Sequence, residues 1–400
     1  MRIGMILDKS FPPDPRVENE ARILMDDGHQ LFLFCLDFDG ASGSEIINGI
    51  QVRRNASSNT EYRMSALAYT IPVYAWLLRG RIRRFLQENE IQVMHVHDMV
   101  VAQAAMKANE SLNLPMVLDL HENRPEIMAL YPHLQRFPGK NLVSIQKWKK
   151  KEESFVRAFD KTVVVTEQAK RELVKRTKVE EGRIIVMPNT VGSDFYDTAE
   201  IDAAVVDRFK KDFVVLYLGD TGLRRGLLTA IEAIPLLVGE IPGLRLVIVG
   251  ANTTDHALKD RARELGVEDR VAFEGWKDES AFPSYLTAAD LCISPLHRNR
   301  HHDTTLANKL FQYMSFSRPI LGSDAKAQEE IINKASCGLV HRAEDPSDFA
   351  EKCLELYRDP NRRRIFGRKG REFLVSEFNL ERISGPLREY YHSMERSERI

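Results

Sequence analysis

The sequence predicts an α/β protein made of two tandem domains, each built on a doubly wound parallel sheet. The chain has 400 residues, which is more than one hydrophobic core usually holds. Short apolar and β-branched runs alternate with helical patterns, as in βαβ units. The alternation stops between residues 188 and 211, where periodicity is weak and a turn-like stretch begins at Pro188, and then resumes. We therefore expect a linker there, with the carboxyl ends of both sets of strands facing a ligand-binding cleft.

The first half is expected to hold six strands with helices between them. The first helix is well marked, because Pro15 suits a first helical position and Gly28 suits a left-handed cap. Val17, Ala21 and Leu24 recur on one face of this helix. The expected strands cover residues 2–7, 30–36, 93–97, 116–120, 162–166 and 183–187.

The second half repeats the pattern and closes with a helical segment. Apolar side chains recur at helical spacing from Phe373 to Tyr390, with a break expected at Ser384, Gly385 and Pro386. The tail from residue 395 is charged. The expected strands cover residues 213–218, 244–249, 270–273, 291–294, 319–321 and 338–340.

Composition excludes several classes of protein. The 57 basic residues are balanced by 58 acidic ones, which argues against a protein that binds nucleic acid over its whole surface. The four cysteines are far apart, so they indicate neither a zinc site nor a disulfide framework and are typical of core thiols in the cytosol. The first apolar run meets Asp8 and Lys9 too early for a signal peptide. We expect a cytoplasmic protein that does not bind nucleic acid.

Two segments favour contact with a membrane surface. The apolar stretch within residues 62–88 is broken by Pro72, falls short of the roughly 20 residues that cross a bilayer, and ends in arginines at positions 79–84. The run from Lys147 to Lys151 holds four lysines around Trp148. Such a run is most often a solvated helix face, and together with the arginines it also fits an anionic membrane. A peripheral location on the inner face of the membrane is the corresponding expectation.

A glycine-bearing turn after the strand 213–218 is the first candidate site. It begins at Gly219 and ends with Arg224, Arg225 and Gly226, and an apolar helix over residues 227–237 follows. Free backbone amides at a helix start favour phosphate, and two arginines stand beside them. The alternative is that the glycines only make the turn and the arginines are solvated.

A second stretch of sequence supports the interpretation of this turn as a phosphate-binding site. Residues 303–314 read DTTLANKLFQYM, and residues 318–322 read RPILG. Here the chain resembles the retaining glycosyltransferases of family 4, which have the GT-B fold. The resemblance extends over essentially the whole chain, and further matching segments are residues 11–14, 165–167, 187–189, 213–219, 273–276 and 285–291.

The resemblance implies two Rossmann-like domains that face each other across a cleft, with a final helix that crosses back to the first. We expect an N-terminal acceptor domain over residues 1–190, a donor domain over 191–379, and the crossing segment over 380–400. In the donor domain, the implied donor-binding residues are Gly219, Arg224, Arg225, Thr304, Thr305, Asn308, Lys309 and Gln312.

Three positions depart from the family pattern. Asp220 stands where the family has the first arginine of its diphosphate clamp. Thr304 and Gln312 stand where the family has two glutamates, the first at the donor sugar and the second at the ribose. Gln312 keeps hydrogen-bonding groups but lacks the negative charge of a carboxylate.

In the N-terminal half, the resemblance makes His121 the expected catalytic-site residue, because it follows a strand at its carboxyl end. Arg16, His97 and Glu122 are expected as contacts of the diphosphate or the acceptor. His95 and His97 share one face of a strand and suit a metal, but no further ligands are evident in the sequence.

The loop before the implied sugar site also carries histidines. His297, His301 and His302 precede Asp303, and a donor-lining loop or a solvated surface is favoured there over a metal. We expect no metal and no cofactor.

The implied function is transfer of a hexose from a nucleotide diphosphate sugar to a hydroxyl of a glycan or lipid-linked acceptor, with retention, in polysaccharide biosynthesis. Two alternatives stay open. One is a nucleotide-sugar epimerase of the same architecture, which needs paired acids and bases at the sugar. The other is a catalytically silent, glycosyltransferase-like binding partner, which the residues at positions 220, 304 and 312 motivate.

Overall fold

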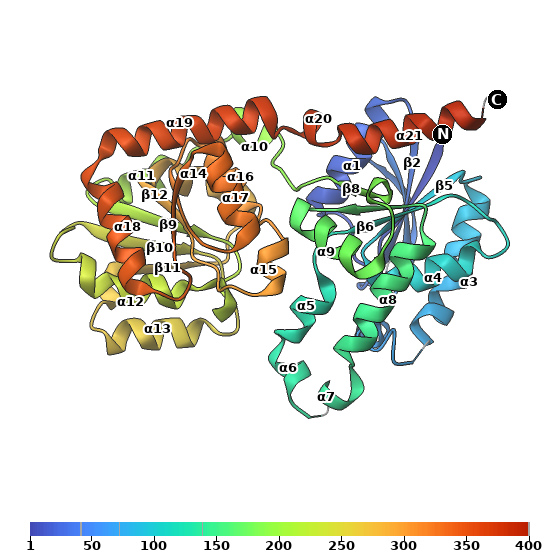
Figure 1. Ribbon diagram of the computed structural model, residues 1–400, viewed down its shortest axis with the longest axis horizontal. Coiled ribbons are helices and arrows are strands. Elements are labelled where there is room, and N and C mark those ends of the chain that lie inside the picture. The colour runs from blue at the N-terminus through green and yellow to red at the C-terminus, as the bar shows by residue number, and fades with distance from the viewer. Residues whose placement is uncertain (41, 72, 138, 399–400) are drawn as a thin grey trace. The chain divides into compact units, whose positions relative to one another are not determined.

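The computed structural model describes residues 1–40, 42–71, 73–137 and 139–398 (Figure 1). The chain forms two compact units, Met1–Pro188 with Ile383–Ile400, and Asn189–Arg382. The boundary lies two residues before the expected one, and the chain returns to the first unit at Ile383, three residues after the expected start of the crossing segment.

The sheet of the first unit has eight strands in the order β3-β4-β2-β1-β5-β6-β7-β8. Every neighbouring pair is parallel except β3 and β4. The inner strands are buried on both faces and most of their residues are apolar, although β5 also carries His95 and His97. The strands are β1 (Arg2–Ile6), β2 (Gln30–Asp37), β3 (Gly43–Ile47), β4 (Ile50–Ala56), β5 (Val93–His97), β6 (Met116–Leu120), β7 (Lys161–Val164) and β8 (Ile184–Val186).

The prediction of six strands in this half missed the hairpin of β3 and β4. β3 is almost wholly exposed, and β4 alternates buried and exposed residues only at Ile50 and Val52 before it reaches two arginines. An edge hairpin of this kind lacks the long apolar run of a central strand. The turn does carry a signal, because Asn48 and Gly49 both have positive φ and form the Asn-Gly pair typical of tight hairpins.

Helices cover both faces of this sheet (Figure 1). In α1, the side chain of Asp14 caps the amide of Val17, Pro15 is the first residue, and Gly28 has φ of 84°, which confirms the predicted start and end. The helices are α1 (Pro15–Asp26), α2 (Asn59–Ser65), α3 (Val73–Glu88), α4 (Met99–Asn109), α5 (Arg124–Ala129), α6 (Pro132–Gln135), α7 (Gly139–Leu142), α8 (Ile145–Ala158), α9 (Glu167–Thr177) and α21 (Gly385–Glu398).

The second unit holds a six-stranded parallel sheet in the order β11-β10-β9-β12-β13-β14. The strands are β9 (Phe213–Leu218), β10 (Leu244–Val249), β11 (Val271–Gly275), β12 (Leu291–Ser294), β13 (Ile320–Ser323) and β14 (Gly338–His341). The helices are α10 (Asp194–Asp197), α11 (Ala203–Arg208), α12 (Leu227–Leu237), α13 (Asp255–Glu264), α14 (Phe282–Ala288), α15 (Arg300–Thr304), α16 (Lys309–Ser315), α17 (Lys326–Ala335), α18 (Pro346–Arg358), α19 (Pro360–Glu377) and α20 (Leu380–Ile383).

The segment expected as a linker is wrong beyond Pro188. Residues from Asn189 onward belong to the second unit and form α10 and α11. The side chain of Asp202 caps α11, and its backbone amide donates to the hydroxyl of Ser284 at 2.9 Å. α10 has four residues and α11 has six, which is too short for a helical period to show in the sequence.

All four cysteines are free and buried, in agreement with core thiols. Within the described part of the chain, none of the helices is long and apolar enough to cross a bilayer.

Candidate functional site

The glycine-bearing turn after β9 brings a strand end, a 3₁₀ turn and a helix start together. Gly219 follows β9 with φ of 103°, and Leu223–Arg225 form the turn before α12. Gly226 has φ of 76°, and a Cβ atom there would lie 1.7 Å from the carbonyl oxygen of Pro295. Only glycine fits this position, so the turn has a fixed backbone beside its two arginines.

Lys309, the first residue of α16, reaches back to this turn. Its Nζ lies 3.5 Å from the ring centroid of Tyr217 and 3.7 Å from where a Cβ atom on Gly219 would be. The side chain is buried, and Nζ has no hydrogen-bond partner within the described residues. Burial, with the nearby charges of Arg225 and Arg224, holds the pKa of Lys309 well below its usual range. A buried ammonium without an anion is costly, so this site is electrostatically incomplete.

The carboxylate of Asp220 places a negative charge beside Arg224 and Arg225. Its Oδ2 lies 3.0 Å from Nε of Arg225 and 3.4 Å from Nη1 of Arg224, and its Oδ1 accepts from Asn252 at 2.6 Å. Burial raises the pKa of Asp220, but the charge and hydrogen bond of Arg225 outweigh burial and lower it below its usual value. A phosphate at this turn would therefore compete with Asp220 for the arginines.

The side chains of the donor-binding residues predicted along α15 and α16 differ in their hydrogen bonds. Thr304 is buried, and its hydroxyl donates to the carbonyl of Arg300 at 2.8 Å. The hydroxyl of Thr305 donates to the carbonyl of His301 at 2.8 Å. Both hydroxyls are therefore used within the loop. Asn308 stands at the N-cap of α16, but its side chain makes no capping hydrogen bond. Because α16 has only seven residues, its backbone dipole contributes little.

Gln312 brings in a carboxylate that sequence reasoning missed. Its Nε2 donates to Oε1 of Glu279 at 2.6 Å. Glu279 comes from the short turn Glu279–Ala281 after β11, 33 residues earlier in the chain. The pair places a negative charge beside the amide that replaces the family's glutamate.

Of the histidines expected in a loop before the implied sugar site, His301 and His302 lie within α15. Asn299 caps α15 by accepting from the amide of His302 at 2.9 Å. The ring of His302 lies 2.7 Å, through Nδ1, from the carbonyl oxygen of His297, and burial lowers its pKa to about 4. His302 is therefore neutral at pH 7.

In the first unit, His121 belongs to a buried network centred on Asp119 at the end of β6. Oδ2 of Asp119 lies 2.8 Å from Nε2 of His121, 3.2 Å from Nδ1 of His97 and 2.7 Å from Nε of Arg16. Its Oδ1 accepts from Nη2 of Arg16 at 2.5 Å. The register of β5 and β6 pairs His97 directly with Asp119, which explains how the two side chains meet.

The network extends to the C-terminal helix. Nε2 of His95 lies 3.1 Å from Oε2 of Glu20, whose Oε1 lies 3.1 Å from Nη2 of Arg16. Nδ1 of His95 lies 2.8 Å from the hydroxyl of Tyr391, which is fully buried on α21. Arg16 also donates from Nη1 to the carbonyl of Met187 at 3.0 Å. Arg16 is held by these contacts within the first unit, and its expected role at the diphosphate or the acceptor stays a prediction.

The expectation that His95 and His97 lack further ligands is wrong. Glu20 and Asp119 lie beside them, and one ligand atom from each of the four residues falls within 4.8 Å of the others. Arg16, however, already places a cation against both carboxylates. We therefore describe the group as a network of hydrogen bonds around Asp119 and close ion-pair contacts around Glu20, and the absence of a metal requirement stays a prediction.

Glu122 lies at the same edge of the sheet. Its Oε1 accepts from Nη1 of Arg124 at 2.9 Å, and Nη2 of Arg124 lies 3.3 Å from Asp98. Glu122 and Arg124 are partly exposed whereas Asp98 is buried, and the acceptor contact expected of Glu122 stays a prediction.

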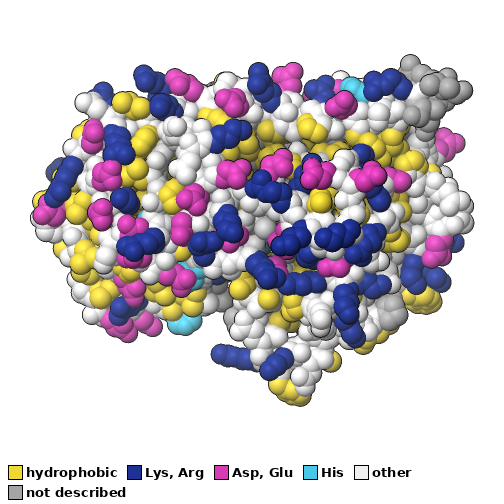
Figure 2. Space-filling model, viewed as in Figure 1, with side chains coloured by type: hydrophobic (Ala, Val, Ile, Leu, Met, Phe, Trp, Pro, Cys, Tyr) yellow, Lys and Arg dark blue, Asp and Glu magenta, His cyan; other side chains and the backbone are white. Residues whose placement is uncertain are grey.

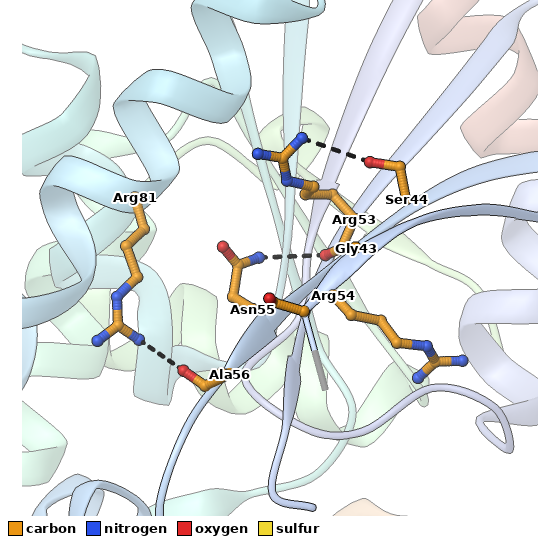
Figure 3. A pocket seen from close by; sticks show the side chains of 8 residues that line it. Gly43, Ser44, Arg53, Arg54, Asn55, Ala56 and Arg81 are labelled. Atoms are coloured by element: carbon orange, nitrogen blue, oxygen red, sulfur yellow. Dashed lines mark hydrogen bonds between the residues drawn. The ribbon is translucent and has the colours of Figure 1, made fainter. Parts of the chain in front are cut away.

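A hollow of about 360 Å³ lies beside β3 and β4, and it holds none of the predicted site residues (Figure 3). Three of its lining side chains are arginines, and each is paired with a carboxylate: Arg53 with Glu88, Arg54 with Glu45, and Arg81 with Glu61. Carboxylates thus balance the charges of these three arginines.

Two family descriptions match the chain. "Glycosyltransferase Family 4" matches residues 16–195, and "Glycosyl transferases group 1" matches residues 199–373. Among curated proteins, the putative glycosyltransferase EpsD of Bacillus subtilis is 27% identical over 161 residues, 40% of each chain. The lipopolysaccharide core biosynthesis glycosyltransferase LpsE of Rhizobium meliloti is 28% identical over 197 residues, 48% of this chain and 54% of that one. The matches thus span only about half the length of these relatives.

Solved structures match over nearly the full length. Sucrose-phosphate synthase from Thermosynechococcus elongatus has a TM-score of 0.77 at 15% identity and covers 99% of both chains. HepE of Anabaena, solved in complex with UDP, has a TM-score of 0.69 at 14% identity and covers 98% of this chain and 100% of its own. With two parallel-sheet units and family matches from residue 16 to 373, the chain belongs to the family 4 glycosyltransferases and has the GT-B fold.

Proposed function

We propose that the protein transfers a sugar from a nucleotide diphosphate sugar to an acceptor hydroxyl, with retention, in the biosynthesis of a polysaccharide or related glycoside. The observation that carries the proposal is the buried, unpartnered Nζ of Lys309 beside Gly219. Arg224 and Arg225 belong to the same turn, so three basic side chains are available there to bind a phosphate.

The chemistry follows from these charges. The bond from the anomeric carbon to the diphosphate oxygen breaks, and its electron pair leaves with the diphosphate. Lys309 and the arginines stabilise that negative charge. The acceptor oxygen bonds to the anomeric carbon from the same face, and its proton passes to the departing phosphate oxygen. This scheme requires no protein nucleophile and no metal.

Thermal-shift measurements with UDP, GDP, ADP and their sugars test the donor assignment. A ligand that binds the folded state raises the melting temperature with its concentration. We expect one nucleotide class to stabilise the protein, and turnover of its sugar to follow when an acceptor is added. Stabilisation without turnover, even as slow donor hydrolysis, would instead favour the silent binding partner, for which Asp220 on the two arginines is the motivating observation. No stabilisation by any nucleotide would contradict both functions.

A lipid-linked acceptor fits one surface of the first unit. Trp76 and Ile71 are 61% and 47% exposed, and Leu142 is 45% exposed. The hydroxyl of Thr70 donates to the carbonyl of Leu142 at 2.8 Å, so the segment before α3 lies against α7. Figure 2 shows Lys and Arg side chains gathered over α8 and α9. Exposed apolar side chains next to basic ones suit an anionic bilayer.

Cosedimentation with lipid vesicles tests this contact. We expect binding to phosphatidylglycerol vesicles, weaker binding to phosphatidylcholine vesicles, and loss of binding when Trp76 and Ile71 are changed to serine. Trp276, which is 74% exposed in the second unit, supplies the matched control as Trp276→Ser. Equal binding of all variants would remove the membrane contact from the proposal.

A further inference from the structure

Asp119 is fully buried and receives hydrogen bonds from the side chains of Arg16 on α1, His97 on β5 and His121 in the loop after β6. Burial alone would raise its pKa, but Arg16 and His121 hold the pKa of Asp119 well below its usual range. The group is therefore a carboxylate at neutral pH. An ionised carboxylate accepts hydrogen bonds and donates none.

This fixes which nitrogen of His121 carries hydrogen. Nε2 lies 2.8 Å from Oδ2 of Asp119, so Nε2 must be the donor. In a neutral imidazole the other nitrogen then holds a lone pair. That nitrogen is Nδ1, for which the described residues provide no hydrogen-bond partner, and the His121 side chain is 13% exposed.

The same reasoning applies to His97. Its Nδ1 lies 3.2 Å from Oδ2 of Asp119 and also 3.2 Å from Nε2 of His121. Nδ1 of His97 and Nε2 of His121 both donate a hydrogen to the Asp119 carboxylate, so these two nitrogens do not hydrogen-bond to each other. Burial lowers the pKa of His97, so its ring stays neutral and adds no charge beside His121.

We propose that Asp119 is a positioning residue that locks His121 in the Nε2–H tautomer and so presents Nδ1 as a hydrogen-bond acceptor for a hydroxyl of the sugar substrate. The role of the hydroxyl rests on the proposed function, whereas the tautomer does not. Arg16 supports the arrangement by holding both oxygens of Asp119.

Protonation would abolish the acceptor, because both ring nitrogens of an imidazolium carry hydrogen. Burial lowers the pKa of His121, but the charge and hydrogen bond of Asp119 outweigh burial and raise it. We therefore expect activity to fall as the pH drops through the pKa of His121, which gives the pH profile an acidic limb. The charged and titratable groups that face His121 are Asp119, Arg16, Asp14, His97 and Asp98.

Nitrogen-15 NMR of the full chain with labelled histidine tests the tautomer without any substrate. The His121 signals are assigned from the spectrum of His121→Gln. We expect a protonated-type shift at Nε2 and an unprotonated-type shift at Nδ1 above the pKa of the ring. The opposite tautomer, or an even mixture, would overturn the proposal. An inactive protein with the expected tautomer would contradict the proposed function and leave the role of Asp119 in the tautomer intact.

Kinetics of Asp119→Asn test the consequence. We expect kcat/KM to fall about tenfold, which corresponds to about 1.4 kcal/mol, with nucleotide affinity unchanged and the acidic limb moved to lower pH. Asp160→Asn, at the other end of β6, is the matched control and should change none of these. A folded Asp119→Asn protein with wild-type kcat/KM and an unmoved limb would overturn the proposal. If that variant does not fold, the NMR measurement on the wild-type chain decides.

Discussion

Asp220 stands directly after β9 and binds both arginines that follow it. An incoming diphosphate must displace this carboxylate, whereas none of the described residues hydrogen-bonds to Nζ of Lys309. The three cations of the turn therefore contribute differently. When the diphosphate binds, the two arginines exchange the Asp220 carboxylate for a phosphate group. Lys309, in contrast, gains an anionic partner without losing one.

Arg225→Ala should weaken binding of the nucleotide diphosphate by about 1.5 to 3 kcal/mol, the range for a hydrogen bond to a charged group. The fold should survive, because the side chain is partly exposed in the turn and its carboxylate partner there is Asp220, 3.0 Å from Nε. Isothermal titration calorimetry measures the change. Arg263→Ala, whose side chain is 67% exposed on α13, is the matched control. Unchanged affinity in a folded Arg225→Ala protein would contradict the phosphate site.

Binding of the diphosphate should take up a proton through Lys309. In the empty site burial lowers its pKa, and the phosphate charge raises it again. Between those two values the bound state holds more protons, so affinity falls as the pH rises through that window. Calorimetry in buffers of different ionisation enthalpy measures the uptake, which should vanish in Lys309→Met. Equal uptake in the two proteins would assign the proton to another group.

At the scale of elements, α21 joins the end of the chain to the first unit. Leu387 and Tyr391 are fully buried, and Ile383 is 8% exposed, so one face at helical spacing is covered. Arg388 adds an ion pair, with its Nε 2.8 Å from Oδ2 of Asp27. The helix thus completes the unit rather than trailing from it.

Deleting residues 380–400 should give an aggregation-prone or inactive protein, because an apolar face of the first unit loses its cover. Deleting 395–400 should be nearly harmless. It removes the ion pair between Glu395 and the N-terminal amine, 3.2 Å apart, and such pairs contribute about 1 kcal/mol or less. Size-exclusion chromatography and thermal melting distinguish the two deletions. A soluble, fully active product of the longer deletion would show that α21 is dispensable.

Over the whole molecule, ionisable groups of both units change their pKa on folding. Burial lowers the pKa of four histidines, which therefore bind fewer protons when folded: His29, His97, His302 and His341. His121 acts in the opposite sense, because its pKa is raised. Three paired carboxylates also have a lowered pKa and affect the free energy of unfolding at lower pH: Asp27, Asp98 and Asp119.

The free energy of unfolding should therefore fall as the pH drops below about 6.5, because these histidines bind more protons in the unfolded chain than in the folded protein. The contribution of His302 is lost between about 6.5 and its folded pKa of about 4. The carboxylates act below about 3.9, where the unfolded chain becomes protonated first. Urea unfolding at several pH values measures the slope, and His302→Gln should reduce it above pH 4. Stability that rises from pH 7 to pH 4 would contradict this account.

The sequence was sufficient for the parts of the fold that are locally encoded. Buried parallel strands are rich in apolar residues, and the predicted strands at β5, β6, β9, β10 and β12 have the observed bounds. The start of α12 was also predicted, because Gly226 and the preceding arginines stand together in the chain. The edge hairpin was missed despite its Asn-Gly turn, since its exposed strand has no apolar pattern.

Only the tertiary structure decided how the side chains of the two candidate sites meet. Lys309 reaches Gly219 from 90 positions along the chain, and Arg16 reaches Asp119 across 103. His97 and Asp119 end neighbouring strands, yet their contact depends on the register of β5 and β6, where a shift of one residue would turn one side chain to the opposite face. Local sequence determines strands, helices and turns through short-range preferences. Contacts between distant charges arise only from strand register and helix packing, so the partners of Asp119 and Lys309 appear with the folded chain.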